Sequence, residues 1–108
     1  MRDRLRIAVP SKGRLAEPTL QLLADAGISV PADDRRLIVR IPGQPLEVLF
    51  ARTDDIPTLI ADGAADVGVA GGNQLLEHGD DGIAVLAELG YGPCTLVVAA
   101  PEIGRAHV

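Results

Sequence analysis

The chain has 108 residues, of which 47% are hydrophobic, 23% charged and 2% aromatic. This composition is that of one folded domain and excludes a disordered or fibrous chain. Fifteen acidic against ten basic residues give a net charge of −5. The broad positive field of a nucleic-acid-binding protein is therefore absent, and any bound anion must be held locally.

The cysteine and hydropathy patterns predict a cytoplasmic protein without membrane contact. A single cysteine, Cys94, cannot form an internal disulfide, and no second cysteine or histidine pair stands at the spacing of metal ligands. The apolar run 96–100 is far shorter than the roughly 20 residues that cross a bilayer. The basic residues near the start are not followed by an uninterrupted apolar stretch, so no export signal is expected.

In the first half of the chain, the sequence predicts a strand, a helix and a hairpin. The strand covers residues 5–9 and ends at Pro10. Apolar residues at helical spacing predict a helix from about 15 to 26, with Gly27 just beyond its last turn. Two aliphatic runs joined by a Pro-Gly-Gln-Pro connection then predict the hairpin: residues 36–41 and 46–50.

The second half predicts two short helices and three strands. Asp54 or Asp55 can cap the first helix, which is about two turns long, has Pro57 in its first turn and ends at Gly63. A second short helix is expected around residues 75–77. The strands are three further aliphatic runs: 65–70, 83–89 and 95–100. Strands that alternate with helices favour an α/β domain with a largely parallel sheet.

Four polar residues at the first strand-to-helix junction form the most informative motif: Ser11-Lys12-Gly13-Arg14. A glycine between two cations can direct backbone N–H groups, the helix dipole and both side chains at one anion, such as phosphate or pyrophosphate. The same residues also suit a solvated turn in which Gly13 takes a positive φ. The spacing matches neither a Walker A loop nor a dinucleotide-binding G-x-G-x-x-G motif.

A second glycine-rich strand end follows the predicted strand 65–70, with Gly71, Gly72 and Asn73. Ligands collect at the carboxyl ends of strands in open α/β sheets, although these residues also suit a tight turn that starts the next helix. Arg52, just beyond another strand, is a further candidate contact, or an arginine in local structure beside an aspartate. No sequence pattern indicates a nucleophilic or two-carboxylate catalytic site.

Five segments occur in a fixed order along the chain: residues 7–15 with 17–20, 36–40, 52–57, 63–71 and 89–94. The last three segments follow the patterns R-x-x-D-I-P, G-x-x-D-x-G-I-x-G and L-G-F-G-x-C. In the second of these patterns Val69 replaces the isoleucine, and in the third Tyr91 replaces the phenylalanine. Together the segments resemble the amino-terminal part of the ATP phosphoribosyltransferase family, the first enzyme of histidine biosynthesis. The resemblance extends over about residues 5–102.

The resemblance implies an α/β fold in the form of a type II periplasmic-binding-protein-like lobe. Such a lobe has a mostly parallel mixed sheet flanked by helices, and the active site lies in the cleft against a second lobe, which is largely missing here. Residues 1–92 would form the first lobe. Residues 93–108 would form the crossover strand and the start of the truncated second lobe.

The resemblance also implies the substrates. The family transfers a phosphoribosyl group from phosphoribosyl pyrophosphate to N1 of the adenine of ATP, with Mg²⁺ bound mainly through the substrate. The family implies assembly as a homo-oligomer or with a regulatory subunit. No residue receives a catalytic role, and the residues expected to bind substrate are Lys12, Gly13, Arg14, Arg52, Gly71, Gly72 and Asn73.

Two departures from the family pattern limit this interpretation. Gly72 and Asn73 replace a basic or polar residue and an aspartate, and no T-G-x-T-like phosphoribosyl-binding loop occurs before Val108. We therefore expect the chain alone to be incomplete for catalysis. Two alternatives remain: a non-catalytic nucleotide- or anion-binding lobe, and an assembly subunit in which residues 95–100 form an unpaired apolar edge strand that pairs with another chain.

Overall fold

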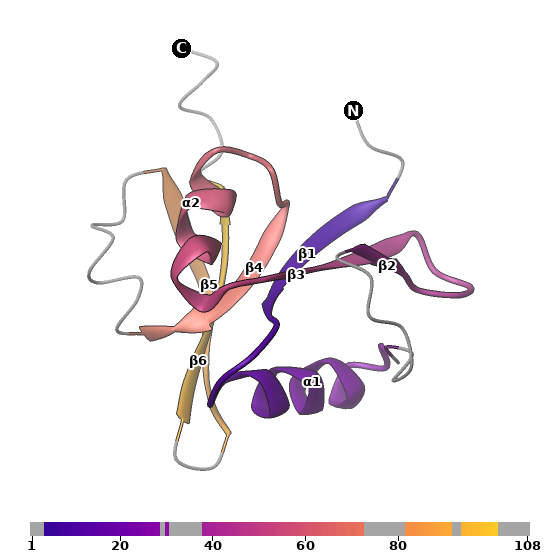
Figure 1. The fold of residues 1–108 in the computed structure, drawn as a ribbon, viewed down its shortest axis with the longest axis horizontal. Helices are drawn as coiled ribbons and strands as arrows, with labels where there is room; N and C mark the ends of the chain where they lie inside the picture. Colours follow the sequence, from indigo (N-terminus) through magenta and orange to yellow (C-terminus); the bar gives the residue numbers. More distant parts are fainter. Residues whose placement is uncertain (1–3, 29, 31–37, 73–81, 92–93, 102–108) are drawn as a thin grey trace.

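The computed structural model describes residues 4–28, 30, 38–72, 82–91 and 94–101 (Figure 1). They form six strands and two α-helices, with a 3-10 helix at Thr53–Asp55. In chain order the elements are β1 (Leu5–Pro10), α1 (Ala16–Asp25), β2 (Ile38–Arg40), β3 (Leu46–Ala51), α2 (Ile56–Ala61), β4 (Val67–Gly71), β5 (Ile83–Tyr91) and β6 (Cys94–Pro101). The six predicted strands and the first two predicted helices are confirmed. The helix expected around residues 75–77 lies outside the described residues.

All six strands belong to one sheet, in the order β2-β3-β1-β4-β6-β5. β1 is parallel to β3 and to β4, and the other three neighbouring pairs are antiparallel. The expectation of a mostly parallel sheet is therefore wrong, and the sheet is mixed. β6 inserts antiparallel between β4 and β5, and the β2–β3 hairpin adds a third antiparallel pair.

β6 is an interior strand between β4 and β5. Its residues Leu96, Val97 and Ala99 are buried. The alternative in which residues 95–100 form an unpaired edge is therefore wrong, because both sides of this strand already carry partners. The division of the chain at residue 93 into two lobes stays a prediction.

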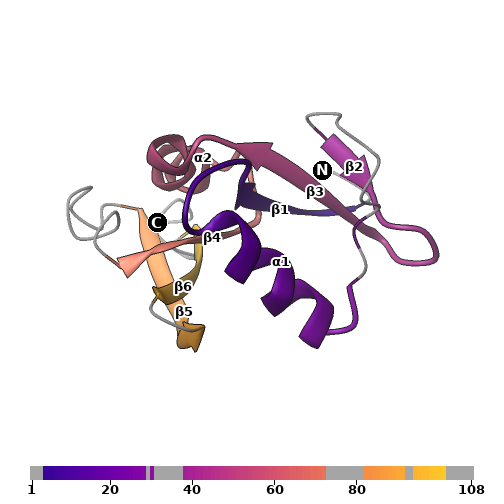
Figure 2. The ribbon, with the colours of Figure 1, turned by 60° about the horizontal axis from the view of Figure 1, so that its bottom comes forward.

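The two helices pack on opposite faces of the sheet (Figure 2). Side chains alternate between faces along a strand, so Ile7 and Val9 of β1 join Leu23 of α1 in one buried cluster. Ala8 joins Ile56 and Ile60 of α2 in the other. Each helix thus closes its own small aliphatic core.

Both helices end as the glycine pattern predicts. Gly27 has φ +88°, and its N–H donates to the carbonyl of Ala24 at 3.0 Å while that of Ile28 donates to Leu23 at 2.8 Å. These bonds define a Schellman motif, which needs a left-handed residue after the helix. Gly63, with φ +79°, ends α2 through the same pair of bonds, from Gly63 to Ile60 and from Ala64 to Leu59.

The predicted side-chain cap of α2 is wrong. Asp55 holds the N-cap position, but its side chain makes no capping hydrogen bond. A side-chain cap requires extended backbone at the N-cap, whereas Asp55 has φ −89° and ψ −16° because the 3-10 helix runs directly into α2. The prediction that Pro57 lies in the first turn is confirmed.

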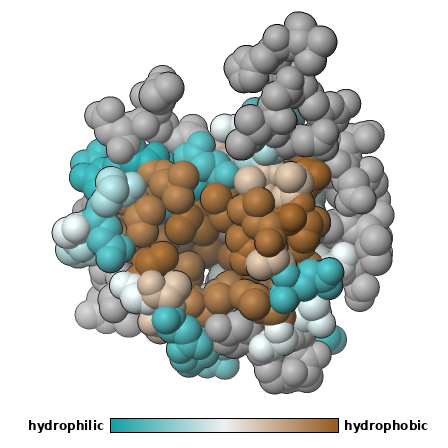
Figure 3. Space-filling model, turned by 180° about the vertical axis from the view of Figure 1, so that it is seen from behind, coloured by the Kyte–Doolittle hydropathy of each residue, from teal (hydrophilic) through white to brown (hydrophobic). Residues whose placement is uncertain are grey.

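Seen from behind, the described residues present a broad apolar surface (Figure 3). Across the described part of the chain, four large hydrophobic side chains are exposed: Leu5, Leu20, Val85 and Leu86. Val85 and Leu86 belong to the edge strand β5, where the pairing with β6 shifts register between Val85 and Ala87. In the same residues no helix is long and apolar enough to span a membrane.

Candidate functional site

Three parallel strands end at one edge of the sheet. Pro10 at the end of β1 lies opposite Ala51 at the end of β3, and Ala8 lies opposite Gly68 of β4. The N–H of Ser11 donates to the carbonyl of Ala51 at 2.9 Å, which ties the first turn to the end of β3. The segments that follow these strands therefore begin side by side at the carboxyl edge, where ligands bind in open α/β sheets.

The turn between β1 and α1 is exposed to solvent. Lys12, Gly13 and Arg14 are all exposed, and Gly13 has φ +90°. The positive φ predicted for a glycine turn is thus observed. The carbonyl of Gly13 accepts a bond from the N–H of Ala16 at 3.3 Å, so the turn leads directly into α1.

No side chain caps the start of α1. Its N-cap residue is Leu15, which has no polar side-chain atom. The hydroxyl of the buried Thr19 donates back to the carbonyl of Leu15 at 2.6 Å and fixes the first turn. The N-terminal end of the helix, with its partial positive charge, therefore follows Lys12 and Arg14 without a side-chain cap, and the carboxylate of Glu17 lies in its first turn.

Arg52 stands at the end of the neighbouring strand. It is exposed and extended, with φ −67° and ψ 142°, and its carbonyl accepts the N–H of Asp55 at 2.9 Å. Within the described residues, no hydrogen bond or ion pair is recorded for its side chain. The backbone is thus fixed by the 3-10 helix, while the guanidinium is exposed at the carboxyl edge.

The glycines at the end of β4 differ in what they do. A Cβ on Gly68 would lie 2.5 Å from Cδ1 and 2.8 Å from Cγ1 of Ile60, so this glycine is required for packing of α2 on the sheet. A Cβ on Gly72 would meet only Val97, at 3.8 Å. Gly72 therefore leaves room for a Cβ, unlike Gly68. Asn73 lies outside the described residues.

An ionic network that sequence reasoning missed lies on the same face as α2. Glu47, 7% exposed, accepts a bond from Nε of Arg6 at 3.0 Å. The carboxylate of Asp66 accepts the backbone N–H of Arg6 at 2.9 Å, and the N–H of Asp66 donates to the Arg6 carbonyl at 2.9 Å. The aspartate of the G-x-x-D-x-G pattern therefore joins β1 to the start of β4, a role that no local pattern reveals.

The described residues offer no cluster of three or more His, Cys, Asp or Glu side chains that could hold a metal ion. At the carboxyl edge, the exposed cations Lys12, Arg14 and Arg52 and the backbone amides can meet a ligand, and the exposed carboxylates of Asp54 and Asp55 lie in the 3-10 helix after Arg52. The cations and amides suit a phosphate-bearing substrate.

Comparison with known proteins identifies the family. The sequence model of HisG, ATP phosphoribosyltransferase, matches residues 52–107. The chain belongs to the ATP phosphoribosyltransferase family. The match includes four of the residues predicted to bind substrate: Arg52, Gly71, Gly72 and Asn73.

Curated relatives extend the match over nearly the whole chain. The ATP phosphoribosyltransferase of Halobacterium salinarum is 52% identical over 101 residues, which cover 93% of this chain and 36% of the relative. That of Methanothermobacter thermautotrophicus is 45% identical over 100 residues, covering 92% and 34%. The chain therefore spans about a third of the length of these relatives.

A solved structure shares the fold. A chain of the ATP phosphoribosyl transferase (HisG:HisZ) complex from Thermotoga maritima superposes with a TM-score of 0.61 at 27% identity. The superposition covers 80% of this chain and 40% of that one. The mixed α/β architecture described above is thus an architecture of this family.

Proposed function

We propose that this chain is the substrate-binding first lobe of an ATP phosphoribosyltransferase acting in the cytoplasm. The reaction joins C1 of the ribose of phosphoribosyl pyrophosphate to N1 of the adenine of ATP. The bond from that carbon to the pyrophosphate oxygen breaks, and pyrophosphate leaves with the bonding electron pair. This is the first step of histidine biosynthesis.

The observation that carries the proposal is the convergence of three strand ends at the carboxyl edge. The turn with Lys12, Gly13 and Arg14 is tied to the end of β3 by the Ser11 to Ala51 bond, and Arg52 follows that strand directly. Two substrates that carry phosphates need several cations within reach. We infer that Lys12, Arg14 and Arg52 neutralise these phosphates.

The geometry of the turn gives these residues distinct roles in the proposal. Lys12 and Arg14 lie beside the uncapped start of α1, so their charges add to the partial positive charge of the helix. Cations in place before the reaction stabilise negative charge as it develops on the leaving pyrophosphate. Gly71 at the end of β4 and Gly72 directly after it have no side chains, so a substrate could approach the backbone closely there.

Magnesium fits this proposal as a partner of the substrate. The carboxylates described beside Arg52 are the adjacent pair Asp54 and Asp55, and the described residues contain no cluster of three or more groups that would hold the ion. We therefore infer that the ion is held by the phosphate oxygens of the substrate. When bound, it would supply further neutralisation of the pyrophosphate.

We further propose that the chain works with additional polypeptide. A periplasmic-binding-protein-like second lobe would close the cleft over the carboxyl edge, as the short span relative to family members suggests. The broad apolar surface on one side of the molecule supports contact with further protein, because surfaces of this kind usually mark interfaces (Figure 3). The solved family structure is a HisG:HisZ complex, which supports assembly with a regulatory subunit or as a homo-oligomer.

A second candidate function is a nucleotide-binding lobe without catalysis. The observation that favours it is the exposed turn with Lys12 and Arg14, which can hold a phosphate without contacting a second substrate. Binding of one phosphate does not by itself position both substrates, and that positioning supplies much of the rate enhancement.

A chimera tests the proposal. The described chain would replace the matching part of the Halobacterium salinarum relative, with which it is 52% identical, and phosphoribosyl-ATP formation would be followed. We expect activity from the chimera and none from the 108-residue chain alone. Replacing both Lys12 and Arg14 with Ala in the chimera should lower kcat/KM at least a hundredfold, because two phosphate contacts are lost.

The matched control is Asp62→Asn, which changes one exposed charge at the end of α2. Its kcat/KM should equal that of the unmodified chimera. An active, folded chimera whose kcat/KM does not change on loss of Lys12 and Arg14 would contradict the proposed site.

A further inference from the structure

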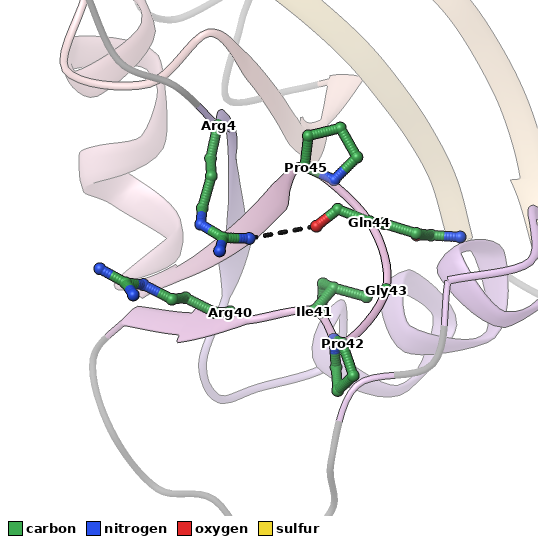
Figure 4. Close-up of a pocket in the computed structure, with 7 residues that line it drawn as sticks. All are labelled: Arg4, Arg40, Ile41, Pro42, Gly43, Gln44 and Pro45. Carbon is green, nitrogen blue, oxygen red and sulfur yellow. Dashed lines mark hydrogen bonds between the residues drawn. The ribbon is translucent and has the colours of Figure 1, made fainter.

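A hollow lies at the opposite edge of the sheet from the candidate substrate site. It has a volume of about 740 Å³ and is lined by Arg4 and the hairpin residues Arg40, Ile41, Pro42, Gly43, Gln44 and Pro45 (Figure 4). Arg4 precedes the first residue of β1, and the hairpin turn precedes β3. The six residues of β1 separate this hollow from the carboxyl edge by roughly 20 Å.

The hollow is basic in a protein that is acidic overall. Its lining contains two arginines and no acidic residue, whereas the whole chain has a net charge of −5. On the same face of the sheet, Glu47 stands in register between Arg40 of β2 and Arg6 of β1. The carboxylate of Glu47 is bonded to Arg6, and the described residues show no ion pair between Glu47 and Arg40.

The charge count at this corner leaves an excess. Among the described residues, three arginines, Arg4, Arg6 and Arg40, stand against two carboxylates, Glu47 and Asp66, which leaves an excess of one positive charge. An anion bound at the hollow would offset this excess.

The two arginines of the hollow are positioned differently. Nη1 of Arg4 donates to the carbonyl of Gln44 at 3.1 Å, which holds the guanidinium over the hairpin turn. The Arg40 side chain is exposed, and among the described residues no hydrogen bond or ion pair is recorded for it. Figure 4 shows Arg4 extending from the start of β1 toward the hairpin turn, and Arg40 extending from β2 with its guanidinium directed away from Pro42 and Gly43.

The turn beneath them is rigid and leaves space. The N–H of Gln44 donates to the carbonyl of Ile41 at 3.3 Å, and Gly43 follows Pro42 with φ +77°. This is the sequence preference of a type II turn, with proline and then glycine at its centre. A Cβ on Gly43 would meet nothing within 4 Å, so a ligand can approach the turn.

We propose that Arg4 and Arg40 form a second anion site that binds a phosphate group at the amino edge of the sheet. Each guanidinium can donate a pair of parallel hydrogen bonds to phosphate oxygens. The group is either inorganic phosphate or the phosphate of a nucleotide, and both present the same dianion to the two arginines. This site is independent of the proposed substrate site at the carboxyl edge.

The test is a titration of the ¹⁵N-labelled 108-residue chain, followed by NMR, with inorganic phosphate in one series and AMP in another. We expect saturable shifts of the Gly43 and Gln44 amides and of the Arg4 and Arg40 side-chain N–H signals. A lower dissociation constant for AMP identifies a nucleotide phosphate as the ligand. Equal constants identify the phosphate group alone, and both results support the site.

Variants separate this site from the carboxyl edge. Arg40→Gln should raise the dissociation constant measured at Gly43 about tenfold or more, because a charged bidentate donor is lost. Arg40→Lys, which keeps the charge but not the paired donors, should give an intermediate value. Replacing both Lys12 and Arg14 with Ala should leave the shifts at Gly43 unchanged.

Three results would overturn the proposal. The first is the absence of saturable shifts at Gly43 and Gln44 with either ligand. The second is an unchanged dissociation constant in the folded Arg40→Gln variant. The third is loss of the Gly43 shifts on replacement of Lys12 and Arg14, which would assign all phosphate binding to the carboxyl edge.

Discussion

Residues of the family pattern occur both where α2 packs against β4 and in the turn that leads into α1. They have opposite roles at the two places. Gly68 lies in a contact so close that a methyl group would collide with the fully buried Ile60. Lys12, Gly13 and Arg14 are exposed to solvent. The comparison teaches that a family motif can mark a packing constraint at one strand end and a candidate binding site at another.

The largest stability effect is expected from the packing contact itself. Ile60→Ala removes a side chain that is 0% exposed and joins the α2 core. The free energy of unfolding should fall by about 2–5 kcal/mol, from lost burial and the remaining cavity. Urea unfolding followed by circular dichroism measures the change, and a loss below about 1 kcal/mol would mean that α2 is not packed as described.

A smaller loss of stability is expected when a methyl group is added to the contact between Gly68 and Ile60. Gly68→Ala should lower the free energy of unfolding by about 1–3 kcal/mol, because the new Cβ would approach Ile60 at 2.5 Å. Combining it with Ile60→Val, which removes Cδ1, should cost less than the sum of the two changes. The matched control is Gly72→Ala, whose Cβ would meet only Val97 at 3.8 Å and should leave stability nearly unchanged. If the losses in the free energy of unfolding of the two single variants simply add in the double variant, the contact between Gly68 and Ile60 is contradicted.

The ion pair between Arg6 of β1 and Glu47 of β3 should contribute as much to the free energy of unfolding as the Gly68 contact, or less. Glu47→Gln leaves the part-buried guanidinium of Arg6 without its carboxylate, and we expect a loss of about 1–3 kcal/mol in the free energy of unfolding. Glu88→Gln, at an exposed position of β5, is the control and should have almost no effect. Equal losses in the two variants would show that the Arg6 pairing contributes nothing specific.

The smallest stability effects are expected in the exposed turn. Gly13→Ala forces alanine into φ +90° and should cost about 1–2 kcal/mol. Replacing Lys12 and Arg14 with Ala should change stability by no more than about 0.5 kcal/mol, although it should abolish phosphate binding at the carboxyl edge. If the double variant unfolds instead, the side chains of Lys12 and Arg14 stabilise the fold. The contrast between this exposed turn and the packed Gly68 would then be wrong.

Local signals predicted the elements well because local forces set their ends. Gly27 and Gly63 end the two helices in the left-handed backbone that glycine adopts without strain. Pro42 and Gly43 likewise mark the hairpin turn. In each case the decisive interaction lies within a few residues along the chain, so the sequence pattern contains it.

The remaining features depend on residues far apart in sequence. The placement of β6 between β4 and β5 depends on strand pairing across the whole sheet. The local pattern of apolar residues does not show whether this strand is interior or at an edge. Arg4 and Gln44 meet across 40 positions, so the hollow between them left no signal in the sequence. The cap predicted at Asp55 failed because the preceding 3-10 helix sets its backbone conformation.

The candidate site was predicted in part. The strand ends that carry Lys12, Arg52 and Gly71 do lie along one edge, as expected for ligand sites in α/β sheets. The sequence did not distinguish Gly68, which the packing of α2 requires, from Gly72, which has room for a Cβ. That distinction depends on the position of Ile60 in the folded chain.

The most direct test of the central claim is an NMR titration of the 108-residue chain with ATP, observing the backbone amides of the carboxyl edge. The account predicts saturable shifts at Gly13, Arg14, Arg52 and Gly72 with one shared dissociation constant. It also predicts that these shifts disappear together when Lys12 and Arg14 are replaced with Ala. Saturating ATP that leaves these four amides unshifted, or shifts at these amides that survive the double replacement, would contradict the account, whereas shifts confined to Gly43 and Gln44 report the separate site at the amino edge.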